Sequence, residues 1–184
     1  PRSSMSCSKA LSPDASFGAG GTVITDFGLA DQAYAVVIQS DGKLVIGGNM
    51  VTSDTSFYDF LLARYNPDGT LDSSFGNKGM VTTDINKNED RANALIIQLD
   101  GKLVAGGYGI SGCYSLIGCI SDFALIRYNT DGGLDTTFGR RGVLTTDWGG
   151  YKDGINGLAI QSDGKIWAAG GTDNDFALSR YLPW

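Results

Sequence analysis

Hydrophobic and polar residues alternate in short runs along the chain, and the same runs return three times in the same order. The clearest run is DFALIRY at residues 122–128, with counterparts DFLLARY at 59–65 and DFALSRY at 175–181. Side chains in these runs alternate with the period of two that is typical of a β-strand. No segment of the sequence has a convincing helical period, so the pattern predicts an all-β protein.

Three further runs in each repeat are also strand-like. The first is rich in β-branched residues and ends in Asp, the second is apolar and ends in Gln, and the third begins with Lys. The first run lies at 22–26, 80–84 and 143–147. The second lies at 33–39, 92–98 and 155–161, and the third at 43–47, 102–106 and 165–169. An Asp-Gly pair separates the second run from the third, which predicts a hairpin turn because Gly adopts positive φ at little cost.

The repeats are about 60 residues long. Each contains a Phe-Gly pair, beginning at Phe17, Phe75 or Phe138, and a later pair of glycines, at 47–48, 106–107 or 170–171. Four antiparallel strands at this interval predict the blades of a β-propeller. The predicted repeats span residues 17–74, 75–137 and 138–184, with a closing strand at 22–26.

The predicted propeller domain spans residues 10–184. Residues 1–9 form a polar run without an apolar core, so they do not read as a signal peptide. We expect this segment to be disordered, and it can be a cloning remnant or the scar of a removed leader.

The repeat resembles the delta-60 repeat family and, more distantly, the NHL-type propellers. The stretches that carry the resemblance are LDSSFGNKGMVTTD, ALIIQLDGKLVAGG and DFALIRYNTDG. The resemblance extends over nearly all of Ala10 to Tyr181. It implies that the run ending in Gln is the innermost strand of a blade and the run ending in Asp the outermost. Proteins with such repeats are mostly bacterial and extracytoplasmic, and most lack an assigned reaction.

Three blades are too few for a closed ring, since known propellers mostly use four to eight. The strand at 22–26 has no blade before it, and the third repeat supplies only three strands. We therefore expect a two-fold homodimer, in which each N-terminal strand completes the last blade of the other copy and six blades close one ring. The alternatives are a fragment of a longer repeat protein and a ring of more subunits.

The composition excludes several classes of function. The 184 residues include no histidine, which excludes Ser-His-Asp and Cys-His catalysis and histidine-ligated zinc. The net charge of −6 makes a nucleic-acid partner improbable on electrostatic grounds. No apolar run approaches the roughly 20 residues of a membrane span. Cys113 and Cys119 lie in what reads as a loop and either form a local disulfide, which would indicate an oxidising compartment, or remain reduced.

Residues that recur in every repeat have two interpretations. The Asp and Arg of the DFALIRY motif, for example Asp122 and Arg127, either line a charged site or join neighbouring blades, and we favour the second. A turn after this motif places oxygen side chains at alternate positions, which resembles the start of a calcium loop, but we favour an Asx turn. The weak metal candidates in this turn are Asp68, Asp72, Asp131 and Asp135. We expect no cofactor, with calcium as the alternative.

Loops that differ between repeats are the expected place of ligand binding. They carry aromatic, amide and acidic residues that suit a carbohydrate or a peptide. The predicted ligand-binding residues are Tyr34, Tyr58, Asn93, Tyr108, Trp148, Tyr151 and Asn156. The leading hypothesis is an extracytoplasmic binding module.

Two other functions remain open. One is a histidine-free hydrolase, an esterase or glycosidase that uses carboxylate, Ser or Tyr chemistry, with or without a metal. Its weak catalytic candidates are Asp31, Glu89, Asp90, Lys152 and Asp153. The other is a structural spacer in a larger assembly.

Overall fold

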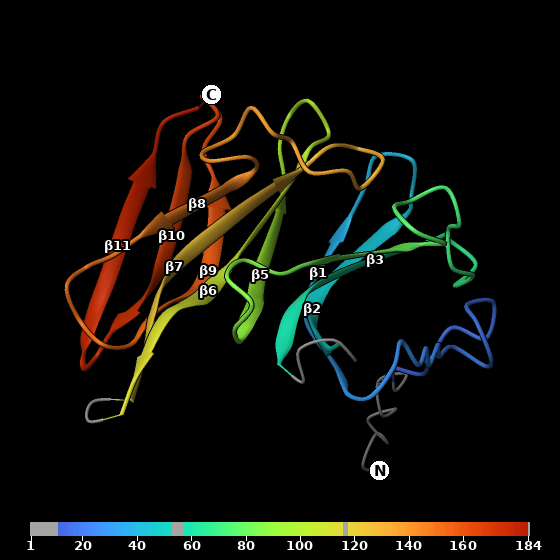
Figure 1. Cartoon of the computed structure of the whole chain (residues 1–184). Helices are drawn as coiled ribbons and strands as arrows, with labels where there is room; N and C mark the ends of the chain where they lie inside the picture. Colours follow the sequence, from blue (N-terminus) through green and yellow to red (C-terminus); the bar gives the residue numbers. More distant parts are fainter. Residues whose placement is uncertain (1–10, 53–56, 116–117, 184) are drawn as a thin grey trace, which may run out of the picture.

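The computed structural model describes residues 11–52, 57–115 and 118–183, and these residues form three antiparallel β-sheets without an α-helix (Figure 1). Sheet 1 contains β1 (Asp31–Ile38), β2 (Leu44–Val51), β3 (Tyr58–Tyr65) and β4 (Met80–Thr83). Sheet 2 contains β5 (Asp90–Ile97), β6 (Leu103–Tyr114), β7 (Gly118–Tyr128) and β8 (Val143–Thr146). Sheet 3 contains β9 (Asp153–Ile160), β10 (Ile166–Thr172) and β11 (Asp175–Tyr181).

Each sheet is a meander in which neighbouring strands in sequence are also neighbours in space. The predicted strand order within a repeat is therefore confirmed. The three sheets stand side by side as an open fan, and the described strands do not close into a ring (Figure 1). The predicted disordered segment 1–9 lies outside the described residues.

Neighbouring sheets pack through two apolar cores. In the first, Phe60 and Leu62 of sheet 1 are buried together with Leu103 and Ile126 of sheet 2. In the second, Phe123 and Leu125 of sheet 2 occupy the positions of Phe60 and Leu62 and are buried with residues of sheet 3. The DFALIRY motif is therefore the strand through which one sheet packs on the next.

The Arg of this motif belongs to a buried charged cluster beside the core. Arg127 Nε donates to Asp135 Oδ2 at 2.9 Å, Lys102 Nζ contacts the same oxygen at 2.8 Å, and the guanidinium lies 4.7 Å from the centre of the Phe138 ring. Arg64 forms the equivalent cluster in sheet 1. These contacts join β3 and β7 to the connections that follow them, so Arg64 and Arg127 stabilise their blades.

The recurring glycine pairs allow a β-bulge in the first strand of each sheet. A Cβ atom on Gly48 or Gly107 would lie 1.9 or 1.7 Å from a backbone carbonyl oxygen of that strand. In sheet 3 the equivalent position is Gly170, where the distance would be 1.9 Å. The pair 170–171 is thus displaced by one residue from its counterparts, and Ala169 stands where the other sheets have their first glycine.

Two predictions about local structure are wrong. The segment around Cys113 and Cys119 is an extension of the β6–β7 hairpin rather than a loop. Residues 22–26, although described, are not a β-strand and make only one isolated bridge, between Gly18 and Thr22. A strand requires a hydrogen-bonding neighbour, and the described part of this chain places none beside 22–26.

Candidate binding cleft

A cleft of about 790 Å³ lies between the loop ends of sheets 2 and 3. Its walls come from the β6–β7 hairpin, from the start of β9 and from the β10–β11 turn. The lining residues are Glu89, Asn93, Tyr108, Ile110, Gly118, Cys119, Ser121, Tyr151, Lys152, Asp153, Gly154, Asn156, Gly171 and Asp173. The cleft therefore combines aromatic, amide, acidic and basic side chains.

The long β6–β7 hairpin forms one wall of the cleft. Cys113 and Cys119 face each other across this hairpin and are joined by a disulfide, with their Cα atoms 3.9 Å apart. Ser121 links the hairpin to the opposite wall, because its backbone N–H donates to the Tyr151 carbonyl at 3.0 Å and its hydroxyl donates to the Asp153 carbonyl at 3.1 Å. The wall is thus fixed to sheet 3.

Asp173 holds the other wall in place. It adopts a positive φ of 46° in the β10–β11 turn, and its Oδ1 accepts hydrogen bonds from the backbone N–H groups of Tyr151 and Lys152 at 3.0 and 3.1 Å. Both of these side chains remain exposed, so the backbone is ordered while the Tyr151 ring faces solvent. Such an arrangement presents an aromatic surface on a rigid support.

Glu89 organises the inner end of the cleft. Its carboxylate accepts a hydrogen bond from the Tyr108 hydroxyl at 3.0 Å and forms an ion pair with Arg91 at 2.8 Å. Burial, followed by the negative charge of Glu89, raises the pKa of Tyr108 to about 12. The phenol therefore stays neutral near pH 7 and acts as a hydrogen-bonding group rather than as a nucleophile.

The structure brings together some of the predicted ligand-binding residues but not all of them. Asn93, Tyr108, Tyr151 and Asn156 line the cleft, although the Asn93 amide already donates to the Ile155 carbonyl at 2.8 Å. Three others lie elsewhere. Trp148 packs edge-on against buried Phe123, the Tyr58 ring is covered by the Arg91 guanidinium, and Tyr34 is an exposed residue of β1.

The catalytic candidates do not meet at one point. Glu89, Lys152 and Asp153 belong to the cleft lining, but Asp153 is buried, and its Oδ2 accepts a hydrogen bond from the Trp148 N–H at 2.8 Å. Asp31 and Asp90 occupy the equivalent position in sheets 1 and 2.

The metal candidates of the turn after the DFALIRY motif serve structural roles in this geometry. Asp68 and Asp131 each accept a backbone N–H two residues later, as in an Asx turn. Asp72 and Asp135 are buried in the arginine clusters, where hydrogen bonds and cations hold their carboxyl pKa well below its ordinary value. Sequence reasoning missed the contributions of Asp173 and of the disulfide hairpin to the cleft, because both depend on contacts with the segment around Tyr151 that the local sequence does not indicate.

The fold defines a protein built from β-propeller blades. Residues 39–75 and 98–138 match the model of a family described as "Domain of unknown function (DUF5122) beta-propeller". These two segments, which make up less than half of the chain, are similar to this β-propeller family, and that similarity confirms the predicted resemblance to propeller repeats. A search of curated proteins gave no match. No helix within the described residues has the length and apolar character needed to cross a membrane.

Proposed function

We propose that this protein is an extracytoplasmic binding module that takes a carbohydrate or peptide ligand in the cleft between sheets 2 and 3. The observation that carries the proposal is the 790 Å³ cleft, which combines an exposed tyrosine ring with amide and charged groups on a fixed backbone. An aromatic face stacks on a sugar ring or a peptide side chain, and the polar groups supply hydrogen bonds. The Cys113–Cys119 disulfide supports a location outside the reducing cytoplasm.

Replacing Tyr151 with alanine is expected to weaken binding about 10-fold or more, because stacking aromatic side chains contribute strongly to recognition. Ligands would first be found on glycan and peptide arrays and then measured by calorimetry. Tyr114→Ala is the matched control, since Tyr114 is similarly exposed but does not line the cleft. Equal affinity of the two variants, or no hit on either array, would count against this function.

We also propose that the functional unit is a ring of two copies. Residues that are buried in sheets 1 and 2 are exposed at the same positions in sheet 3. Phe60 and Phe123 are 0% and 1% exposed, whereas Phe176 is 81% exposed. The exposed face of sheet 3 therefore has the composition of a blade interface without a covering sheet.

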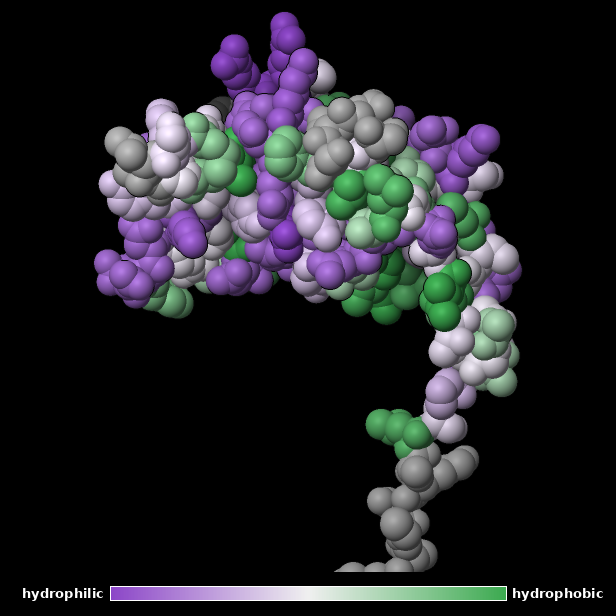
Figure 2. Space-filling model, turned by 60° about the horizontal axis from the view of Figure 1, so that its bottom comes forward, coloured by the Kyte–Doolittle hydropathy of each residue, from purple (hydrophilic) through white to green (hydrophobic). Residues whose placement is uncertain are grey.

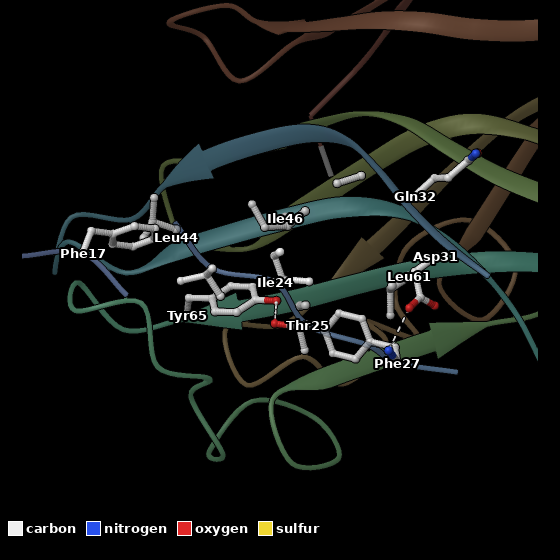
Figure 3. Close-up of a pocket in the computed structure, with 14 residues that line it drawn as sticks. Phe17, Ile24, Thr25, Phe27, Asp31, Gln32, Leu44, Ile46, Leu61 and Tyr65 are labelled. Carbon is white, nitrogen blue, oxygen red and sulfur yellow. Dashed lines mark hydrogen bonds between the residues drawn. The ribbon is translucent and has the colours of Figure 1, made fainter. Parts of the chain in front are cut away.

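The opposite end of the fan has the complementary feature. An apolar cavity of about 410 Å³ lies on the outer face of sheet 1 and is lined by Leu44, Ile46 and Tyr65 (Figure 3). The equivalent residues of sheet 2 are Leu103, Ala105 and Tyr128, and these are buried against sheet 1. Figure 2 shows hydrophobic residues concentrated toward the side from which the N-terminal segment extends.

The N-terminal segment already makes the contacts of an outermost strand from a preceding blade. The Tyr65 hydroxyl donates to Thr25 Oγ1 at 2.8 Å, which matches the Thr83–Tyr128 pair at 2.8 Å between sheets 1 and 2 (Figure 3). Likewise, the Gly18 N–H donates to the Asp68 carbonyl at 2.9 Å, as Gly76 does to Asp131. In the proposed ring this segment would pair with β11 of a second copy, which would place the partner's sheet 3 over the cavity.

Side-chain size at the open ends favours a second copy of this chain as the occupant. Within the chain, a glycine faces a leucine across each interface, at Gly47–Leu95 and Gly106–Leu158. At the open ends these positions are Ala169 and Val36, and Val36 is 58% exposed. Alanine with valine contains the same number of side-chain carbons as glycine with leucine. The two ends thus match each other in volume, which packed interfaces require.

Leu178→Glu is expected to convert the dimer to a monomer by placing a carboxylate in the apolar contact. Leu178 is 49% exposed in the single chain, so the substitution should leave the fold intact. Leu99→Glu is the matched control, because Leu99 is 88% exposed at a hairpin turn. Analytical ultracentrifugation should show dissociation for the first variant only, and an unchanged dimer in Leu178→Glu would argue against this interface.

A further inference from the structure

Two groups of three aspartates lie between neighbouring sheets at equivalent positions. The first contains Asp59, Asp84 and Asp90, and the second contains Asp122, Asp147 and Asp153. In each group, one carboxylate oxygen per residue lies within 4.8 Å of the others. In each group, one residue lies in the third strand of a sheet, one directly follows the fourth strand, and one is the first residue of the next sheet. We call these groups triad 1 and triad 2.

The buried carboxylates in the triads lack enough hydrogen-bond donors. Asp90 is fully buried, and its Oδ2 accepts the Ile85 N–H at 2.6 Å, but its Oδ1 has no partner among the described residues. Asp59, which is 3% exposed, is in the same state, with Oδ2 accepting the Thr52 hydroxyl at 2.9 Å and Oδ1 unpaired within the described chain. Asp153 repeats the pattern in triad 2. Unpaired buried oxygens of this kind are costly.

The triads also lack a compensating positive charge. In the part of the chain that the structure describes, no lysine or arginine forms an ion pair with a triad residue. Burial, together with the charges of Asp84 and Asp59, raises the pKa of Asp90 to about 7. Burial likewise raises the pKa of Asp122, with a smaller effect from Asp147 and Asp153. Three clustered carboxylates without a counter-ion repel one another, and a cation removes that repulsion.

We propose that each triad binds a divalent cation of the calcium type through its carboxylate oxygens. Calcium accepts several oxygen ligands in a flexible geometry, so three carboxylates can serve together with water. Each site would join two sheets, because its ligands come from both. The cation would thus stabilise the angle between neighbouring blades and the adjacent loop face.

A third triad follows if two copies close the ring, and this part rests on the proposed assembly. The residues equivalent to Asp84 and Asp90 are Asp26 and Asp31, and the residue equivalent to Asp59 is Asp175 at the far end of the fan. Asp31 has the same hydrogen-bond pattern as Asp90. Its Oδ2 accepts the Phe27 N–H at 2.7 Å, and its Oδ1 is unpaired in the described residues (Figure 3). Asp175 of a second copy would complete this group.

Calcium titration of chelator-treated protein tests the proposal. Calorimetry should detect two calcium sites per chain if the protein is a monomer and three calcium sites per chain if it is a dimer. Calcium at about 1 mM should raise Tm by about 5 °C or more. Magnesium at the same concentration is the comparison for cation type. The proposal is overturned if the wild-type protein shows neither binding heat nor a calcium-dependent change in Tm.

Variants separate the triads from the assembly. Asp84→Asn with Asp147→Asn should abolish both intrachain sites and remove most of the calcium-dependent rise in Tm. Asparagine also relieves repulsion, so the same variant should melt at a higher temperature than the wild type in chelator. Asp68→Asn is the control, since Asp68 caps an exposed turn, and it should keep the full response. Two sites per chain in a protein that stays monomeric would support triads 1 and 2 while rejecting the dimer.

Discussion

Replacing Asp135 with alanine is expected to lower the free energy of unfolding by about 3–5 kcal/mol, because it leaves the buried Arg127 guanidinium without its carboxylate. Arg127 is 3% exposed and donates to Asp135 at 2.9 Å, and Lys102 shares the same oxygen. The loss combines an uncompensated buried charge with the broken hydrogen bonds from Lys102 and from the backbone and hydroxyl of Thr137. Urea denaturation at constant pH and calcium concentration measures it.

Asp131→Ala is the matched control for this substitution. Asp131 is exposed in the neighbouring turn and accepts one backbone N–H at 2.9 Å, so its removal should cost less than about 1.5 kcal/mol. Similar losses in the two variants would contradict the assigned role of the buried cluster.

Acid titration provides a second measurement on the same pair. Hydrogen bonds from Lys102 and Thr137 hold the pKa of Asp135 well below its ordinary value of 3.8. A lowered folded-state pKa means that the stabilisation is complete above pH 3.8 and is lost as the pH falls toward the folded-state value. The free energy of unfolding of the wild-type protein should therefore fall more than that of Asp135→Ala when the pH is lowered from about 5 to about 2.

Gly107→Ala is expected to destabilise the protein by about 3 kcal/mol or more, because the new Cβ atom would overlap the backbone of the neighbouring strand. That atom would lie 1.7 Å from the Arg91 carbonyl oxygen, and a backbone atom cannot move aside as a flexible side chain can. The β-bulge between Ala92 and Ala94 brings the two strands this close. Thermal unfolding followed by circular dichroism measures the change.

Gly157→Ala is the comparison for Gly107→Ala. Gly157 also lies in a strand, but no described atom is within 4 Å of the position of its Cβ. This substitution should change stability by less than about 1 kcal/mol, since it adds no overlap and restricts the unfolded chain. Equal tolerance of alanine at both positions would show that the bulge glycine is not required.

The strands and their order could be predicted from the sequence because each depends on local information. Period-two alternation identifies a strand, and the Asp-Gly turns fix which strands are neighbours. The recurrence of these signals in all three repeats then identifies the blade. The displaced pair at Gly170 and Gly171 shows the limit of this approach, because only the position of the bulge reveals which glycine is required.

The parts that could not be predicted depend on contacts between distant residues. The β6–β7 extension contains Gly and Cys in place of a regular apolar alternation, and its strands are joined by the Cys113–Cys119 disulfide. Residues 22–26 have a strand-like sequence, yet the described chain offers them no hydrogen-bonding neighbour. Local pattern cannot indicate whether a pairing partner exists.

The site residues illustrate the same limit. The sequence identified polar and aromatic loops as candidates, but only the packing of sheets 2 and 3 places Tyr108 and Tyr151 in one cleft and leaves Trp148 outside it. The aspartates of each triad come from three segments of two repeats, so the local sequence does not indicate that they lie together. Their proximity follows from how one sheet is set against the next.

The measurement that most directly tests the two-fold ring is the molar mass of the protein in solution, by size-exclusion chromatography with light scattering over a series of dilutions. Closure by two copies predicts twice the chain mass of 19.4 kDa, with Leu99→Glu unchanged and Leu178→Glu reduced to a single chain. A folded wild-type protein with the mass of one chain at every concentration would contradict the ring.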